Sequence, residues 1–166
     1  MRIEYMVVKV RLTQFAVATV LTLAAFAVTA QDELRDTFFK EADAARAAAE
    51  AANAELLAPR NYQRGVDEYQ DAEEALRRGR NIETVRSNAG DAANYFSIAT
   101  EKATLAQTAL AQVLKSRQDA ANAKAPQLSP EVWQEAQRKF GDAIRLLERG
   151  DLKGSKRRDV EATSLY

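Results

Sequence analysis

A seven-residue apolar repeat runs through residues 81–125 and constrains the fold more than any other feature of the sequence. Its members fall at alternating steps of three and four, with no proline before Pro126. They are Ile82, Val85, Ala89, Ala92, Phe96, Ala99, Ala103, Ala106, Leu110 and Val113. This spacing places them along one seam of an α-helix. We therefore expect one continuous rod of about 65 Å, at about 1.5 Å per residue, whose alanine-rich seam packs closely against other helices.

The composition removes most familiar catalytic schemes. The 166 residues include no cysteine and no histidine. Disulfides and thiol nucleophiles are therefore excluded, as are the commonest general base and transition-metal ligand. Paired carboxylates such as Glu73-Glu74 do not face each other on a helix, and no phosphate-binding loop or metal-spaced cluster appears. We expect no catalytic residue, no cofactor and no metal site, and hence a protein that is not an enzyme.

The first thirty residues differ in kind from the rest. Basic residues precede an apolar run over 15–28, which ends in Val28-Thr29-Ala30. This is the pattern of a secretory signal peptide cut after Ala30, and it predicts a periplasmic protein. The alternative is an uncleaved membrane anchor, although the run is shorter than the roughly 20 residues that span a bilayer. Without these residues the chain is slightly acidic, which does not support nucleic-acid binding.

Prolines, glycines and capping residues divide residues 31–166 into helices. Proline is favoured in the first turn of a helix, glycine just after its end, and Asn, Ser or Asp at its N-cap. The helices are expected at 32–57, 59–78, 81–125, 130–149 and 151–166. The turns at Gly79 and Gly150 are short, so the helices on either side should be antiparallel neighbours.

An internal repeat relates two parts of the chain at one constant offset. Pro59 falls on Pro130 and Tyr95 on Tyr166, and no gap is needed. The unit is a short helix, a glycine turn and a long helix, and its copies cover about 58–128 and 129–166. The expected fold is all-α: elongated antiparallel hairpins in a coiled-coil-like bundle of two tandem repeats. The second copy is shorter, so the natural chain either ends there or, as we favour, belongs to a longer protein.

One block of residues resembles a known family. The block runs through Leu128-Ser129-Pro130, Trp133, Ala136, Phe140, Ala143, Leu147, Gly150-Asp151-Leu152, Arg157-Arg158 and Leu165-Tyr166. It is similar to the helical-hairpin segment that follows the signal peptide in bacterial envelope proteins of the OmpA type. The layout from Ala58-Pro59 to Gly79 is also similar to a secreted Ala-rich domain of unknown function.

The resemblance implies a periplasmic spacer or scaffold, associated with the outer membrane. In the OmpA type, a separate C-terminal domain binds peptidoglycan, and these 166 residues do not include it. The implied partners are other envelope proteins, and peptidoglycan through such a domain. Independently of the resemblance, the alanine-rich helix seams predict that further copies of the chain could associate through them.

Aromatic and large apolar residues at seven-residue spacing are expected to pack in the core. The predicted core residues are Tyr62, Tyr69, Phe96, Leu110, Trp133, Phe140 and Leu147. In the alternative, a tetratricopeptide-like module, such aromatics would help to bind a peptide or an anionic envelope glycan. Against this alternative, the 34-residue period is missing.

Basic residues cluster at each hairpin turn and are the best candidates for contact with an anionic partner. They are Arg77, Arg78, Arg80, Arg86, Arg149, Lys153, Lys156, Arg157 and Arg158. The alternative is electrostatic: cations near a helix C-terminus complement the helix dipole without binding anything.

Overall fold

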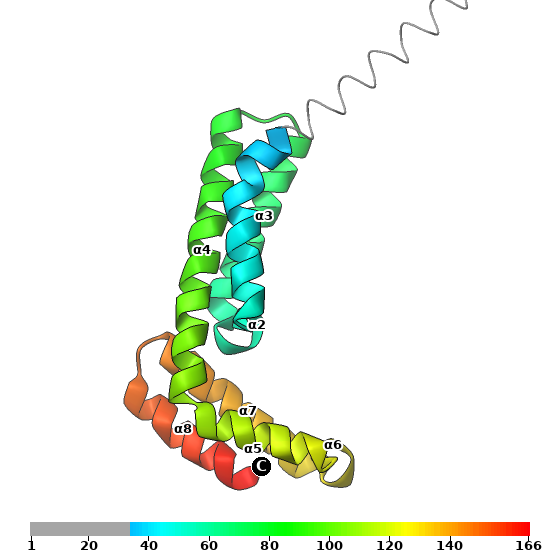
Figure 1. The fold of residues 1–166 in the computed structure, drawn as a ribbon, viewed down its shortest axis with the longest axis vertical. Helices are drawn as coiled ribbons and strands as arrows, with labels where there is room; N and C mark the ends of the chain where they lie inside the picture. Colours follow the sequence, from blue (N-terminus) through cyan, green and yellow to red (C-terminus); the bar gives the residue numbers. More distant parts are fainter. Residues whose placement is uncertain (1–33) are drawn as a thin grey trace, which may run out of the picture. The chain divides into compact units, whose positions relative to one another are not determined.

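The computed structural model describes residues 34–166, so the predicted signal peptide at 1–30 lies outside the described residues and stays a prediction. Residues Glu41–Tyr166 form one compact unit, which carries the features described below. All regular structure in the described residues is helical, which confirms the predicted all-α class (Figure 1). Within the same residues, no helix combines the length and apolar character needed to cross a membrane.

The helices follow one another with short connections. Helical residues 34–51 are followed by α2 (Ala54–Leu57), α3 (Pro59–Arg77) and α4 (Ile82–Ala109). After them come α5 (Ala111–Asn122), α6 (Ala125–Leu128), α7 (Pro130–Glu148) and α8 (Leu152–Leu165).

The helix boundaries follow the local signals in the sequence. A proline stands at the first position of both α3 and α7. Gly79 and Gly150 adopt φ angles of 62° and 86° just after α3 and α7, a left-handed conformation that glycine adopts without a steric penalty. Asn81 begins α4 by accepting a hydrogen bond from the N–H of Glu83, at 3.0 Å.

The expected single rod over 81–125 is wrong, because the helix is interrupted at Leu110. This residue has φ −111° and ψ 20°, and it separates α4 from α5. The N–H of Leu110 still donates to the carbonyl of Ala106 at 2.9 Å, and its side chain remains buried. The apolar seam therefore continues through the interruption.

The expected first helix over 32–57 is also interrupted. Asn53 adopts φ 55° and separates α2 from the helical residues before it. Lys124, which the alignment of Pro59 with Pro130 places opposite Asn53, adopts φ 61° between α5 and α6. The same break therefore occurs at equivalent places in the two halves of the compact unit.

The helices form two bundles of similar construction. In the first bundle (residues 41–109), α2, α3 and α4 pack against one another. In the second bundle (residues 111–166), α7 packs against α8 and α6, and α8 also packs against α5. Figure 1 shows α4 leading into α5 and thereby connecting the two bundles.

Corresponding residues of the two bundles are separated by a constant offset along the sequence up to the hairpin turn. After the hairpin turn, this offset is one residue shorter than before it. Up to the turn, the alignment that lays Pro59 on Pro130 also aligns both ends of α2 with those of α6, and both ends of α3 with those of α7. Residues 78–81 separate α3 from α4, whereas only residues 149–151 separate α7 from α8. The ungapped alignment is therefore wrong beyond the turn, and Tyr166 corresponds to Phe96 rather than to Tyr95.

Two aromatic pairs support this shifted register. Tyr62 meets Phe96 edge to face, with ring centroids 5.5 Å apart, and Trp133 meets Tyr166 in the same way at 5.2 Å. Trp133 corresponds to Tyr62 in the register before the turn, and Tyr166 corresponds to Phe96 in the register after it. Each pair links the N-terminal turns of the first helix of a hairpin to the second helix. Edge-to-face contacts of this kind stabilise the fold beyond the effect of burying the rings.

Candidate functional site

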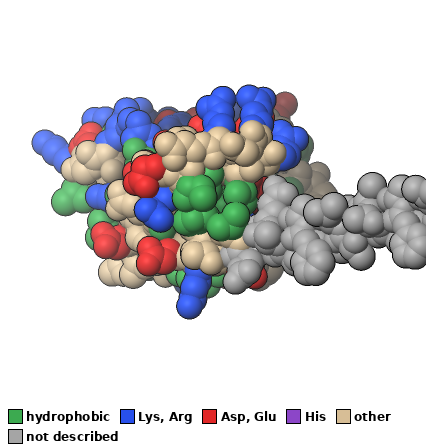
Figure 2. Space-filling model, turned by 90° about the horizontal axis from the view of Figure 1, so that it is seen from above, with side chains coloured by type: hydrophobic (Ala, Val, Ile, Leu, Met, Phe, Trp, Pro, Cys, Tyr) green, Lys and Arg blue, Asp and Glu red, His purple; other side chains and the backbone are tan. Residues whose placement is uncertain are grey.

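Three of the four basic residues around the first turn are engaged with nearby carboxylates. Arg77 and Arg78 both form ion pairs with Glu74, and Arg86 pairs with Glu83 at 3.1 Å. The four basic residues of this turn, Arg77, Arg78, Arg80 and Arg86, are exposed. Figure 2 looks onto the end of the molecule that carries this turn: Lys and Arg side chains gather along one edge, with apolar and acidic side chains beside them. Exposed ion pairs of this kind contribute little to stability.

At the second turn, the basic residues divide into two groups. Lys156 pairs with Asp159, and Arg158 with Glu161, each at 2.6 Å. Arg149, Lys153 and Arg157 are exposed, and none of the three forms an ion pair within the described part of the chain. Arg80 at the first turn is likewise exposed without an ion pair among the described residues, so these three cations and Arg80 are the members of the predicted cluster that are most accessible to an anionic partner.

The structure does not bring the two basic turns together. The end of α7, next to the second turn, contacts the beginning of α3, whereas the first turn follows the end of α3. The 19 residues of α3 therefore lie between them. At 1.5 Å per residue, this corresponds to about 27 Å. The two clusters cannot act as one small-ligand site.

Glu148 makes the contact between α7 and α3, which the sequence did not reveal. Its carboxylate accepts hydrogen bonds from the N–H of Asn61 at 2.8 Å and from Asn61 Nδ2 at 2.7 Å. A longer bond of 3.4 Å comes from the N–H of Arg60. A carboxylate at the N-terminus of α3 satisfies free N–H groups and complements the helix dipole. One side chain thus connects the two bundles.

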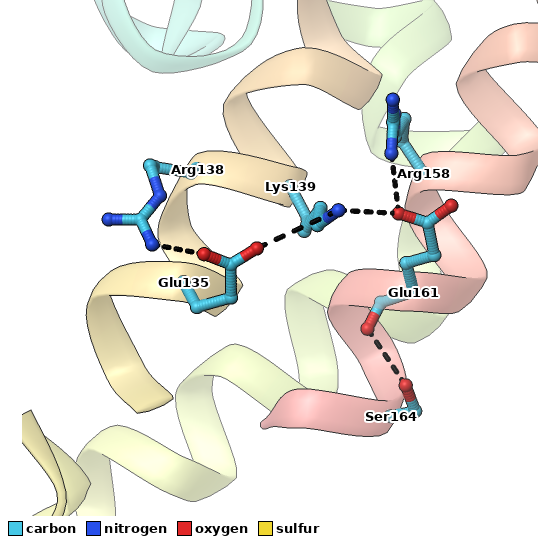
Figure 3. Close-up of polar contacts among 6 residues, drawn as sticks. All are labelled: Glu135, Arg138, Lys139, Arg158, Glu161 and Ser164. Carbon is cyan, nitrogen blue, oxygen red and sulfur yellow. Dashed lines mark hydrogen bonds and ion pairs between the residues drawn. The ribbon is translucent and has the colours of Figure 1, made fainter. Parts of the chain in front are cut away.

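A charged network joins α7 to α8 (Figure 3). Glu135 accepts from Arg138 and lies 3.6 Å from Lys139 Nζ, which in turn lies 3.0 Å from Glu161. Arg158 pairs with the same Glu161 carboxylate. The hydrogen bond from Arg138 lowers the pKa of Glu135, and the one from Lys139 lowers the pKa of Glu161. Lys139 therefore bridges the two helices through two carboxylates.

Equivalent cation–aromatic contacts occur in both bundles. The guanidinium of Arg46 lies 5.5 Å from the ring centre of Tyr69, and that of Arg117 lies 5.8 Å from that of Phe140. In the register that lays Pro59 on Pro130, Arg117 corresponds to Arg46 and Phe140 to Tyr69. Such contacts are worth about 0.5–1 kcal/mol at exposed sites. A cation over the central aromatic residue is therefore a repeated feature of this fold.

The predicted core residues fall into two groups. Five of them are at most 5% exposed: Tyr69, Phe96, Leu110, Phe140 and Leu147. Tyr62 and Trp133, the aromatic residues of the first helical turns, are only partly buried. The hydroxyl of Tyr62 lies 3.2 Å from Glu50, and burial together with this carboxylate raises the pKa of Tyr62. The aromatics thus lie between helices and reach polar groups at their edges.

Tyr166 completes the aromatic cluster of the second bundle. Its hydroxyl donates to Gln137 Oε1, which also accepts from Arg117 Nε at 2.9 Å. Burial raises the pKa of Tyr166 to about 12. The residue is therefore a neutral hydrogen-bond donor at physiological pH.

The inner face of α8 is more polar than that of α4. Ser155 and Asp159, each 2% exposed, occupy the positions of Val85 and Ala89 in the first bundle. Asp159 Oδ2 accepts from Lys156, but Asp159 Oδ1 and Thr163 Oγ1 are buried without a hydrogen-bond partner. Unpaired buried polar atoms cost stability. We therefore expect the second hairpin to be the less stable of the two.

Residues 34–166 contain no group of three acidic, histidine or cysteine side chains placed to hold a metal ion. Comparison of the chain with family models, with curated proteins and with solved structures gives no match. The function proposed below therefore rests on the residues of the chain and on the resemblance described above.

Proposed function

We propose that this chain is a non-enzymatic structural module of the bacterial cell envelope, exported to the periplasm, where it acts as a spacer or scaffold. The observation that carries the proposal is the buried alanine seam of α4. Ala89, Ala92, Ala99, Ala103 and Ala106 are all at most 2% exposed. Small side chains allow helix backbones to approach closely, and close packing resists deformation. The seam extends over most of a 28-residue helix.

Polar side chains that connect helices support the same role. Tyr69 donates to Asp43 at 2.5 Å, Asn61 donates to Glu148, and Lys139 pairs with Glu161. Each contact joins residues from different helices, and the Glu148 contact joins the two bundles. Polar groups used in this way fix the register of neighbouring helices. A spacer requires such a fixed geometry.

The envelope location rests on the N-terminal pattern and on the resemblance to OmpA-type hairpin segments. A signal peptide of this kind directs a chain across the inner membrane. In the proteins it resembles, peptidoglycan is bound by a separate domain. We therefore assign to this chain the role of holding envelope components at a distance, through contacts with other envelope proteins or with its own copies.

The proposal is tested by expressing the full chain in a Gram-negative host and fractionating the cells. We expect a periplasmic protein whose measured mass corresponds to a chain that begins at Gln31. As a control, Ala30→Lys should block cleavage while leaving the apolar run intact. A chain of full mass held in the inner membrane would support the anchor alternative, and an unprocessed cytoplasmic chain would contradict the envelope role.

A second candidate function is binding of an anionic envelope glycan at the second turn. The observation in its favour is the exposure of Arg149, Lys153 and Arg157 without ion-pair partners among the described residues. Replacing all three by Ser should abolish retention on an immobilised anionic polysaccharide at low salt, with little change in stability. Replacing Arg77, Arg78 and Arg86, which pair with carboxylates, by Ser provides a matched control at the other turn. Equal loss in both variants would indicate non-specific charge attraction.

A further inference from the structure

The outer face of α8 combines cations with exposed apolar side chains. Lys153, Arg157 and Val160 follow one another at steps of four and three, so they share one face of the helix. All three are exposed, Val160 to 57%. Two more exposed residues lie at the turn where this face begins: Arg149, the C-cap of α7, and Leu152, the first residue of α8, which is 62% exposed.

The carboxylates of α8 do not neutralise this outer face. Asp159 points inward and is 2% exposed. Glu161 forms ion pairs with Lys139 and Arg158. The side chain of Asp151 caps the start of the helix. Within the described residues, the outer face of α8 therefore keeps a net positive charge.

The corresponding face of α4 in the first bundle is exposed as well, but it is not basic. In the register after the turn, three exposed residues of α4 occupy the equivalent positions. They are Glu83, Ser87 and Gly90, opposite Lys153, Arg157 and Val160 of α8. The shared plan of the bundles thus leaves this face open in both, and it does not require cations or an apolar side chain there.

Lys153 stands at a position where a cation opposes the helix dipole. It is the second residue of α8, whose first turn has no acidic residue, whereas the first turn of α4 has Glu83. A helix N-terminus carries partial positive charge and favours a carboxylate. Complementing a dipole explains Arg149 at the end of α7, but it does not explain Lys153. A cation that costs stability is expected of a residue that serves binding rather than folding.

We propose that the outer face of α8 binds the surface of an anionic phospholipid membrane. The cations Arg149, Lys153 and Arg157 meet the headgroup phosphates, and the apolar side chains of Leu152 and Val160 enter the interface between headgroups and acyl chains. A glycan offers anionic groups but no hydrocarbon for the two apolar residues, so their exposure favours a lipid surface. The inference rests on the proposed spacer role, and it names one envelope component that the spacer holds.

The contact is tested with a fluorophore on a single cysteine, because the chain has no cysteine of its own. The full chain with Val160→Cys carries an environment-sensitive dye, and Gly90→Cys, at the equivalent position of α4, is the control. Vesicles that contain phosphatidylglycerol should shift the emission of the dye at 160 to the blue and leave the dye at 90 unchanged. Vesicles of phosphatidylcholine alone should shift neither. Both proteins have the same N-terminal residues, so these cannot account for a difference between the two positions.

Two matched variants test the charges in the Val160→Cys background. The first removes the cations of the proposed contact: Arg149→Ser, Lys153→Ser and Arg157→Ser. Each cation near an anionic surface strengthens binding by about fivefold, so this variant should bind about a hundredfold more weakly and lose the shift at the lipid concentration that half-saturates the unsubstituted protein. The second removes three paired arginines of the first turn and should keep the shift: Arg77→Ser, Arg78→Ser and Arg86→Ser.

Lys153→Glu separates binding from folding, because it introduces the carboxylate that α4 has at Glu83. The substitution complements the dipole of α8 and should raise the melting temperature, while it weakens the blue shift on phosphatidylglycerol vesicles. Circular dichroism measures the first effect and dye emission the second. A lower melting temperature would show that Lys153 stabilises the fold, and it would remove the argument from the dipole.

Three results would overturn the inference. Equal shifts of the dyes at 160 and 90, or equal losses in the two triple variants, indicate non-specific adsorption. An equal shift on phosphatidylcholine vesicles excludes recognition of the anionic headgroup. Retention on an immobilised anionic polysaccharide without any shift on vesicles assigns the cations to a glycan. Vesicle binding does not depend on export, so an exported chain that does not bind vesicles contradicts only this inference, whereas a vesicle-binding chain that is not exported contradicts only the envelope role.

Discussion

Gly65 provides a sharp test of how the helices of the first bundle pack. A Cβ atom built on this residue would lie 2.7 Å from Cδ1 and 2.8 Å from Cε1 of Phe96. Phe96 is fully buried and is also held by its edge-to-face contact with Tyr62. The ring therefore has little room to move away. Gly65→Ala should force a shift between α3 and α4.

The magnitude of this effect follows from two opposing contributions. Overpacking of a buried site typically costs about 1–3 kcal/mol. Replacing a helical glycine by alanine contributes about 1 kcal/mol in the opposite direction. We therefore expect Gly65→Ala to lower the free energy of unfolding by up to about 2 kcal/mol.

Gly90 is the matched control on the partner helix. No neighbouring atom lies within 4 Å of a Cβ built on Gly90, which is exposed in α4. Gly90→Ala should therefore raise the free energy of unfolding by about 0.5–1 kcal/mol, through helix propensity alone. Urea denaturation followed by circular dichroism measures both variants. Equal stabilisation by the two substitutions would refute the packing of Phe96 against Gly65.

A double variant separates the steric effect from other causes. Phe96→Leu removes the ring atoms nearest to the added Cβ. The cost of Gly65→Ala should be smaller in this background, and the difference between the two backgrounds gives the coupling energy between the residues. An unchanged cost would place the strain elsewhere in α3.

Three further predictions follow from local contacts. Glu148→Ala removes the hydrogen bonds at the start of α3 and should lower the free energy of unfolding by about 1–2 kcal/mol. The control Glu101→Ala, on the exposed surface of α4, should change it little. Equal effects of the two substitutions in urea denaturation would contradict the Glu148 contact. Lys124 adopts a left-handed conformation with φ 61°, so Lys124→Gly should raise the free energy of unfolding by about 0.5–1 kcal/mol. Gly150 has φ 86°, so Gly150→Ala should lower it by about 1 kcal/mol. Changes of the opposite sign in urea denaturation would contradict these backbone conformations. Burial raises the pKa of Tyr166 from 10.0 to about 12, so its contribution to the free energy of unfolding is complete below pH 10 and is lost as the pH rises through about 12. Tyr166→Phe should weaken this loss of stability at alkaline pH. A tyrosinate absorbance titration in which Tyr166 ionises at the ordinary pKa of tyrosine would refute the burial.

The sequence predicted the helix boundaries best, because each one depends on local chemistry. The prolines at 59 and 130, the glycines at 79 and 150 and the cap at Asn81 act within a few residues, so their effects can be recognised without the fold. The interruption at Leu110 has no such signal, since neither glycine nor proline is nearby. Leu110 stays buried, so the apolar period passes through it unchanged.

The candidate site was less predictable, because it depends on contacts between distant residues. The Glu148 contact joins residues 87 positions apart, and no local pattern indicates it. The one-residue change in register after the turn was hidden because an ungapped alignment still paired many similar residues. A comparison of buried positions, Val85 with Ser155 and Ala89 with Asp159, reveals the change only once the structure is known.

The most direct test of the two-bundle account is thiol labelling of single cysteines, because the chain has no cysteine of its own. Val85 and Ser155 are 1% and 2% exposed, whereas Gly90 is exposed and Val160 is 57% exposed. Val85→Cys and Ser155→Cys should label slowly, and Gly90→Cys and Val160→Cys should label rapidly, because Ser155 corresponds to Val85 and Val160 to Gly90 in the register after the turn. Rapid labelling at 155 with protection at 160 would mean that α8 faces the core with a different side, and it would contradict the shared plan of the two bundles.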